Sequence, residues 1–197
     1  MSTDKKTLIY EAVLSLVYEH NDLSRIKVAD IAERANIGKG TVYEYFQSKE
    51  QAIGEALIYM YNKGLESFAR LLGENRGFQE TYYTFLRNFR VMLSKNRHVY
   101  NFMTMNPANF SVHATIQAII HPSLKKLKKR HFELVEKLVE RSINEGIIKA
   151  NPQKFDWQAV ILSSLTCIYL HQQFPDDSLR DEEVLDKAYA AYVKLLN

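Results

Sequence analysis

The stretch IKVADIAERANIGKGTVYEYF, residues 26–46, decides the fold of this chain. It predicts two short helices, residues 27–35 and 39–46, joined by a three-residue turn. Ala32 is small enough for the two helices to touch, and Asn36 tolerates the positive φ that a tight turn requires. Helices this short are unstable alone, so the pattern is typical of a packed helix-turn-helix.

Helical signals continue on both sides of this stretch. Apolar spacing predicts a helix from about Thr3 or Asp4 to His20, and Ser48 is a good N-cap for a long helix that ends near Leu72. Only 4 Pro and 7 Gly interrupt the chain, and we find no alternation typical of a strand. The fold class is therefore all-α with about nine helices, the later ones expected at residues 78–94, 98–105, a short helix leading to 121, 122–144 opened by Pro122, 151–174 and 181–196.

Composition indicates where in the cell the protein is expected, but it does not identify a DNA-binding region. The longest uncharged stretch, residues 157–173, is shorter than the roughly 20 apolar residues that span a bilayer. We see no signal-peptide core at the N-terminus, and the single Cys167 fits a reducing compartment, so we expect a cytoplasmic protein without membrane contact. Residues 1–50 hold seven Lys or Arg and eight Asp or Glu, so bulk charge does not identify a DNA-binding region.

The second short helix carries side chains suited to DNA. Lys39 lies at its start, where residues of a recognition helix reach base edges, and Gly40 permits close approach of the backbone. Thr41 offers a hydroxyl to a phosphate or base and a methyl to thymine. Tyr43 and Tyr45 can donate hydrogen bonds to phosphates. We expect Val42 and Phe46 to point inward.

Residues 31–32, 35–43, 45–46 and 48–50 closely resemble the TetR family of bacterial regulators. The resemblance is specific over about residues 5–60 and architectural beyond. It implies that residues matching Thr41, Tyr43 and Lys49 touch the DNA backbone, while Lys39 and Tyr45 lie at the groove. Asn36 replaces the usual turn glycine of the family, Gly38 the usual serine, and Lys27 the usual Ser or Thr cap. The predicted DNA contacts are Lys27, Gly38, Lys39, Gly40, Thr41, Tyr43, Tyr45 and Lys49.

The same resemblance implies two domains and three partners. Residues 1–48 form a three-helix, helix-turn-helix DNA-binding domain, and residues 49–197 form a helical ligand-binding and dimerisation domain. The expected partners are double-stranded DNA with a palindromic operator, a second copy of the chain, and an unidentified small-molecule effector that relieves repression.

Aromatic residues concentrate between residues 59 and 110, which hold eleven of the 23 in the chain. Together with Met they suit the lining of an apolar cavity, although any single one of them more often fills the core. The TetR resemblance favours a cavity, and its lining favours an apolar or aromatic ligand. The predicted lining is Phe85, Phe89, Tyr100, Met103, Phe110 and His113.

The predicted helix at residues 151–174 is apolar on more than one face. Such a helix must be covered on several sides, either by a second subunit or by the core of its own chain. The resemblance implies that this helix and the last one form a four-helix dimer interface. The residues predicted for it are Val160, Ile161, Leu165, Ile168, Tyr189 and Tyr192.

Two other functional classes remain as alternatives. The first is a helical small-molecule-binding protein or enzyme without DNA binding; the second is an interaction module that has lost DNA binding. An enzyme is disfavoured because we find no Gly-rich phosphate loop, metal-ligand set or nucleophile with a base. We therefore expect no catalytic residues, no metal and no cofactor.

Overall fold

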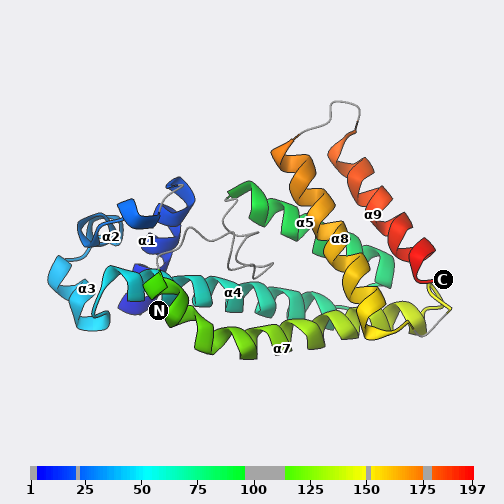
Figure 1. The fold of residues 1–197 in the computed structure, drawn as a ribbon, viewed down its shortest axis with the longest axis horizontal. Coiled ribbons are helices and arrows are strands. Elements are labelled where there is room, and N and C mark those ends of the chain that lie inside the picture. The colour runs from blue at the N-terminus through cyan, green and yellow to red at the C-terminus, as the bar shows by residue number, and fades with distance from the viewer. Residues whose placement is uncertain (1–3, 21–22, 96–113, 150–151, 175–178) are drawn as a thin grey trace. The chain divides into compact units, whose positions relative to one another are not determined.

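The structure, a computed structural model, describes residues 4–20, 23–95, 114–149, 152–174 and 179–197. Within them it contains eight α-helices and no strand, which confirms the all-α fold class. The helix expected at residues 98–105 lies outside the described residues. Labelled as in Figure 1, the elements are α1 (Lys5–Glu19), the 3-10 helix η1 (Leu23–Arg25), α2 (Val28–Arg34), α3 (Lys39–Tyr45), α4 (Lys49–Gly73), α5 (Phe78–Lys95), α7 (Ala114–Asn144), α8 (Lys154–Gln173) and α9 (Asp181–Leu195).

Contacts divide the described residues into two compact units. The first unit takes the chain up to Leu65 together with residues 114–130; the second takes residues 66–95 and the chain from His131 onward. Helices α4 and α7 contribute to both units because each continues across the division. None of the described helices is both long and apolar enough to cross a membrane.

The first unit packs α1, α2 and α3 around fully buried apolar side chains. Helix α2 contacts both α1 and α3. Asn36 has a φ of 53°, so the turn has the left-handed residue that the sequence predicted. The backbone N–H of Ile37 closes the turn by donating to Ala32 O at 3.0 Å. The residues buried at this centre are Ile9, Val13, Ile26, Ile31, Phe46 and Ile53.

Helix ends in the first unit use side chains as well as backbone. Ser48 Oγ accepts from the backbone N–H of Gln51 at 3.1 Å, which confirms Ser48 as the cap of α4. At α2, Asp30 supplies the reciprocal half of a capping box, because its carboxylate accepts from the backbone N–H of Lys27 at 3.0 Å.

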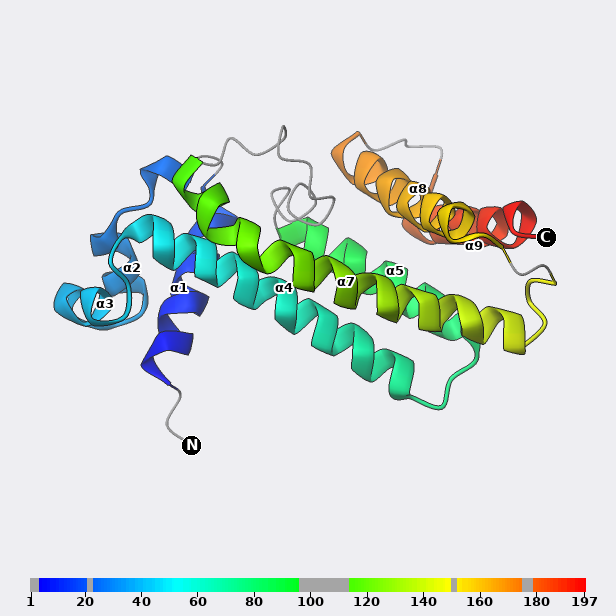
Figure 2. The ribbon, with the colours of Figure 1, turned by 60° about the horizontal axis from the view of Figure 1, so that its bottom comes forward.

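The second unit packs α5 against both α8 and α9. Helices α8 and α9 also pack against each other, as Figure 2 shows. Its buried hydroxyls have partners: Tyr82 donates to Ser164 Oγ at 3.1 Å, and the hydroxyls of Tyr192 and Ser142 lie 2.8 Å apart. An unpaired buried hydroxyl would cost stability, so these tyrosines suit the core. Other fully buried side chains in this unit are Phe78, Leu86, Leu138 and Ile168.

The end of α7 holds the turn between α4 and α5. Arg141 donates to Leu72 O at 2.6 Å, to Arg76 O at 3.2 Å and to Thr81 Oγ1 at 3.0 Å. Four residues further along, Glu145 Oε2 accepts from the backbone N–H of Phe78, the first residue of α5, at 2.7 Å. Arg141 in the last turn of α7 and Glu145 just beyond it thereby satisfy backbone groups at a helix end and a helix start that the helices themselves leave free.

The sequence-based expectation for Pro122 is wrong. Pro122 does not open a helix but lies inside α7, which runs unbroken from Ala114 to Asn144. Proline lacks the N–H for one helical hydrogen bond and usually ends a helix. Upstream of it, Ile116 and Ile120 are buried in the first unit, and this packing offsets the lost hydrogen bond and continues the helix.

His131 on α7 makes stability depend on pH. Burial lowers the pKa of its imidazole to about 4, whereas the unfolded chain titrates near 6.5. The folded state therefore resists protonation, and the imidazole should cost nothing above about pH 6.5. As the pH falls from 6.5 towards 4, it should lower the free energy of unfolding progressively, by up to about 3 kcal/mol.

Urea unfolding at several pH values measures this effect. The wild-type protein should lose stability on acidification faster than His131→Leu, which has no imidazole to protonate. Parallel pH profiles for the two proteins would contradict the assignment.

Candidate nucleic-acid interface

Helix α3 is anchored by its apolar side chains and leaves its polar ones exposed. Val42 and the following Phe46 are 2% and 1% exposed, so both point inward as predicted. Lys39 and Tyr43 are exposed, while Tyr45 is half-buried. A short helix held by one face in this way presents the other to a partner, as a recognition helix must.

The chain itself does not require the two glycines at the start of α3. A Cβ at Gly38 or at Gly40 would have no atom of the described residues within 4 Å, and both glycines are exposed. Neither glycine is explained by packing within this chain, which leaves close approach of a partner as a use for them.

Alanine at position 40 should separate stability from DNA binding. We expect Gly40→Ala to raise stability by up to about 1 kcal/mol through helix propensity. The added methyl should hold the backbone away from DNA and weaken binding by about tenfold, the size of one lost contact.

Thermal unfolding and fluorescence anisotropy with a labelled duplex measure the two effects. The control is Gly64→Ala in α4, where a Cβ also meets nothing within 4 Å. Equal DNA affinity for the two variants would remove Gly40 from the proposed interface.

Three other cations of the first unit form ion pairs with acids. Arg34 Nη1 and Nη2 lie 2.7 Å from the two Glu19 carboxylate oxygens, and these hydrogen bonds lower the pKa of Glu19. Lys6 and Lys63 also form ion pairs, each at 2.9 Å, with Glu55 and Glu11.

Lys27 and Lys39 differ from these paired cations. Both are exposed, and among the described residues neither has an acidic partner. An exposed cation without an ion-pair partner can neutralise a phosphate without first breaking a contact.

Lys49 contacts its own chain. Its Nζ donates to Ser24 O at 2.7 Å and to Ile26 O at 3.1 Å, while Glu50 Oε1 lies 3.9 Å away. The ammonium has three donors, so one remains for a further acceptor. Lys49 thus fixes the start of α4 to the segment before α2, a structural use that the sequence did not suggest.

The predicted ligand pocket is described only in part. Phe85 and Phe89 are buried in the second unit, and the Phe85 ring packs against Phe68 with centroids 4.7 Å apart. The other four predicted lining residues, Tyr100, Met103, Phe110 and His113, lie outside the described residues.

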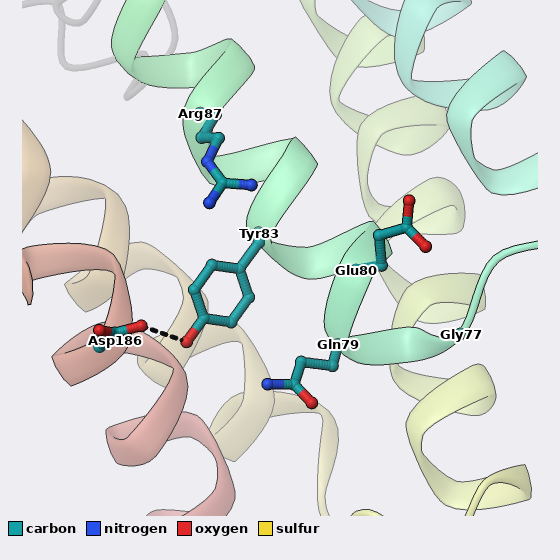
Figure 3. Close-up of a pocket in the computed structure, with 6 residues that line it drawn as sticks. All are labelled: Gly77, Gln79, Glu80, Tyr83, Arg87 and Asp186. Atoms are coloured by element: carbon teal, nitrogen blue, oxygen red, sulfur yellow. Dashed lines mark hydrogen bonds between the residues drawn. The ribbon is translucent and has the colours of Figure 1, made fainter. Parts of the chain in front are cut away.

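A different, polar groove lies on the second unit, with a volume of about 550 Å³ (Figure 3). Tyr83 donates to Asp186 Oδ1 across it at 2.6 Å, and burial together with this hydrogen bond raises the pKa of Tyr83 to about 12. Arg87 pairs with Glu182 at 2.7 Å. The charged side chains of this groove thus already have partners. Its polar lining differs from the apolar lining that the sequence predicts for the ligand pocket. The remaining lining residues are Gly77, Gln79 and Glu80.

The residues predicted for the dimer interface lie within the core of one chain. Tyr189 is half-buried beside the ring of Tyr83, with centroids 5.4 Å apart. The five others are buried because α8 and α9 pack against each other and against α5. These five are Val160, Ile161, Leu165, Ile168 and Tyr192.

Another face of α8 is apolar and exposed. Phe155, Leu162, Leu170 and Phe174 are spaced by seven, eight and four residues, which places them on one side of the helix. They are between 47% and 77% exposed, and Leu195 of α9 is 67% exposed. We call these five residues the outward apolar face. The sequence signal for it was present, because the apolar residues of α8 exceed what one face can hold.

Residues 17–56 match the family model described as bacterial regulatory proteins, tetR family. None of the curated proteins matches the sequence significantly. No group of three or more His, Cys, Asp or Glu able to hold a metal ion occurs in the described part of the chain.

Solved structures share the fold over nearly the whole chain. Transcriptional regulator FadR from Bacillus subtilis, in complex with stearoyl-CoA, is 17% identical over 97% of both chains, with a TM-score of 0.65. Fatty acid degradation regulator FadR from Bacillus halodurans is 14% identical over 100% of this chain and 97% of its own, with a TM-score of 0.68. A TetR/AcrR-family regulator from Thermobifida fusca is 17% identical over 97% of both chains, with a TM-score of 0.66.

Proposed function

Because residues 17–56 match the model of bacterial regulatory proteins of the tetR family, we propose that the protein is a DNA-binding regulator rather than an enzyme: a dimeric transcription repressor released from its operator by a small apolar ligand. The observation that carries the proposal is the exposed face of α3. Lys39 and Tyr43 are exposed there, while Val42 and Phe46 anchor the helix from below. We place the protein in the cytoplasm, where its operator would be.

The proposed DNA contacts divide into reading and positioning residues. Lys39 reads a base edge, with Gly38 and Gly40 letting the backbone approach. The DNA is contacted at or beside its sugar-phosphate backbone by Thr41, Tyr43 and Tyr45. Lys27 and the third donor of Lys49 neutralise phosphates.

Salt titrations test this division. Lys39→Ala should change base preference at one position per half-site by about 1–3 kcal/mol. Lys49→Ala should weaken binding to all sequences alike and reduce the salt slope by about one. Lys49 also donates hydrogen bonds to two backbone carbonyls. The folded fraction of the Lys49→Ala variant must therefore be checked by circular dichroism.

The duplexes for these titrations come from the DNA around the gene and from random sequence. An unchanged slope and affinity for Lys49→Ala would leave that lysine with a structural role alone. If the wild-type protein bound none of these duplexes, the proposed repressor function would be rejected.

We propose a fatty acyl group as the ligand. Buried Phe85 and Phe89 supply an apolar surface, and the FadR of Bacillus subtilis, whose fold this chain shares, binds stearoyl-CoA. The ligand can release DNA only by binding the free state more tightly than the DNA-bound state. Calorimetry with stearoyl-CoA should therefore give weaker ligand binding when operator is present, by the same factor that the ligand weakens DNA binding. Equal affinities would reject this ligand as inducer.

The proposed dimer uses the outward apolar face rather than the buried residues of α8 and α9. Several large apolar side chains exposed on one side of a helix are typical of an interface between subunits. A second copy of the chain is the proposed occupant because a two-fold operator is read by a two-fold dimer.

A further inference from the structure

Helices α4 and α7 make an unusually close contact at Gly54. A Cβ at this position would lie 2.8 Å from Ile119 Cγ2, 3.2 Å from Ile119 Cβ and 3.7 Å from Ile116 Cγ2. All three residues belong to the first unit, and Gly54 is buried. A methyl group at 2.8 Å overlaps its neighbour, so only glycine permits this approach of the two helices.

Comparison with Gly64 shows that the contact, rather than α4 itself, requires glycine. Both glycines lie in the interior of α4, where glycine destabilises a helix relative to alanine. Gly64 is exposed, and a Cβ there would meet no atom of the described part of the chain within 4 Å. At Gly54, but not at Gly64, the destabilising effect of glycine on the helix is therefore accompanied by a close packing contact.

The same turn of α4 is also held from α1. Glu55, the neighbour of Gly54, accepts a hydrogen bond from Tyr10 at 2.8 Å and forms an ion pair with Lys6 at 2.9 Å. Ile53, on the other side of Gly54, is fully buried. Contacts with two helices therefore fix this turn, which begins only a few residues after the Ser48 cap that follows α3.

We propose that Gly54 is a positioning residue for DNA binding: its close contact with Ile119 sets the direction in which α4 leaves the helix-turn-helix. In a two-fold dimer this direction sets the separation of the two recognition helices, which must match the spacing of the half-sites. The inference rests on the proposed function as a DNA-binding dimer.

Gly54→Ala tests the proposal on two kinds of DNA. The probes are duplexes that the wild-type protein selects from a random pool, prepared with both half-sites, with one half-site, and with the half-site spacing lengthened or shortened. The added methyl should push the first turns of α7 away and change the direction of α4. Affinity for the selected two-site duplex should fall at least about tenfold, because two-site binding is lost when geometry forbids it. Affinity for one half-site should stay within about twofold, because α3 itself is unchanged.

Two further variants make the test specific. Gly64→Ala places the same methyl on α4 without a neighbour and should leave both affinities unchanged. Ile119→Leu removes the β-methyl that lies 2.8 Å from the added Cβ, so adding it to Gly54→Ala should restore most of the two-site affinity or the preferred spacing. A merely structural role would not move the ratio of two-site to one-site affinity.

Three results would overturn the proposal. The first is that Gly54→Ala binds the two-site duplex with the same affinity and the same spacing preference as Gly64→Ala. Another is an equal fall in one-site and two-site affinity with a lower melting temperature, which would make the contact structural only. If the wild-type protein selects no duplex at all, the proposed function itself fails and this inference fails with it.

Discussion

Glutamate in place of Leu162 is expected to turn the dimer into a monomer and to lower operator affinity by about a hundredfold or more. Leu162 is 51% exposed and lies within the outward apolar face of α8. The exposed side chain leaves room for a carboxylate in the isolated chain, so the monomer should remain folded. At an interface between two copies, the same charge would be buried without a partner, which is strongly unfavourable.

Light scattering and operator binding measure the two consequences of Leu162→Glu. Wild-type protein should scatter as a dimer at micromolar concentration, and the variant as a 22.9 kDa monomer. Asn88→Glu is the matched control, because Asn88 is an exposed residue of α5 that is not part of the outward apolar face. A variant that remains dimeric would move the proposed interface elsewhere, and a monomeric wild-type protein would reject the dimer.

Replacing Arg141 by methionine is expected to lower the free energy of unfolding by about 3 kcal/mol. Methionine keeps the length and apolar contacts of the side chain but donates no hydrogen bond. Leu72 O, Arg76 O and Thr81 Oγ1 would each lose a donor, and an unsatisfied, partly buried acceptor costs about 1 kcal/mol or more.

Urea unfolding with fixed slope measures the loss for Arg141→Met. Arg141→Lys should recover part of it, since one ammonium can reach some of the three acceptors but lacks the fork of the guanidinium. Arg87→Met is a control, because the Arg87 ion pair with Glu182 is exposed and should contribute under about 1 kcal/mol. A loss no larger than that of the control would show that water replaces Arg141 adequately.

Local signals in the sequence predicted the first unit well. Asn36 at the turn and Ser48 before α4 have conformations or hydrogen bonds that follow from their own chemistry. The inward direction of Val42 and Phe46 follows from helical spacing. Each of these features depends on residues a few positions apart, which a single sequence reveals.

Features that depend on distant partners were not predictable in the same way. Helix α8 is apolar on several sides, and spacing alone does not say which side its own chain covers; the structure assigns Ile161 and Leu165 to the core and leaves Leu162 exposed. The bonds from Lys49 to Ser24 O and Ile26 O join segments more than twenty residues apart. Pro122 lies inside a helix whose preceding turns are buried through Ile116 and Ile120, and the partners that bury them are not visible in local spacing.

Pro122 also divides α7 into two parts that can unfold separately. The residues before it are held by the core around Ile116 and Ile120, whereas the last turn of the helix, which contains Arg141, belongs to the second unit. With one main-chain bond missing at the proline, fraying that starts at Ala114 can stop there without propagating along the rest of the helix. A single continuous helix can thus belong to two foldons, and the loosening of its first turns need not unfold the unit that contains its last ones.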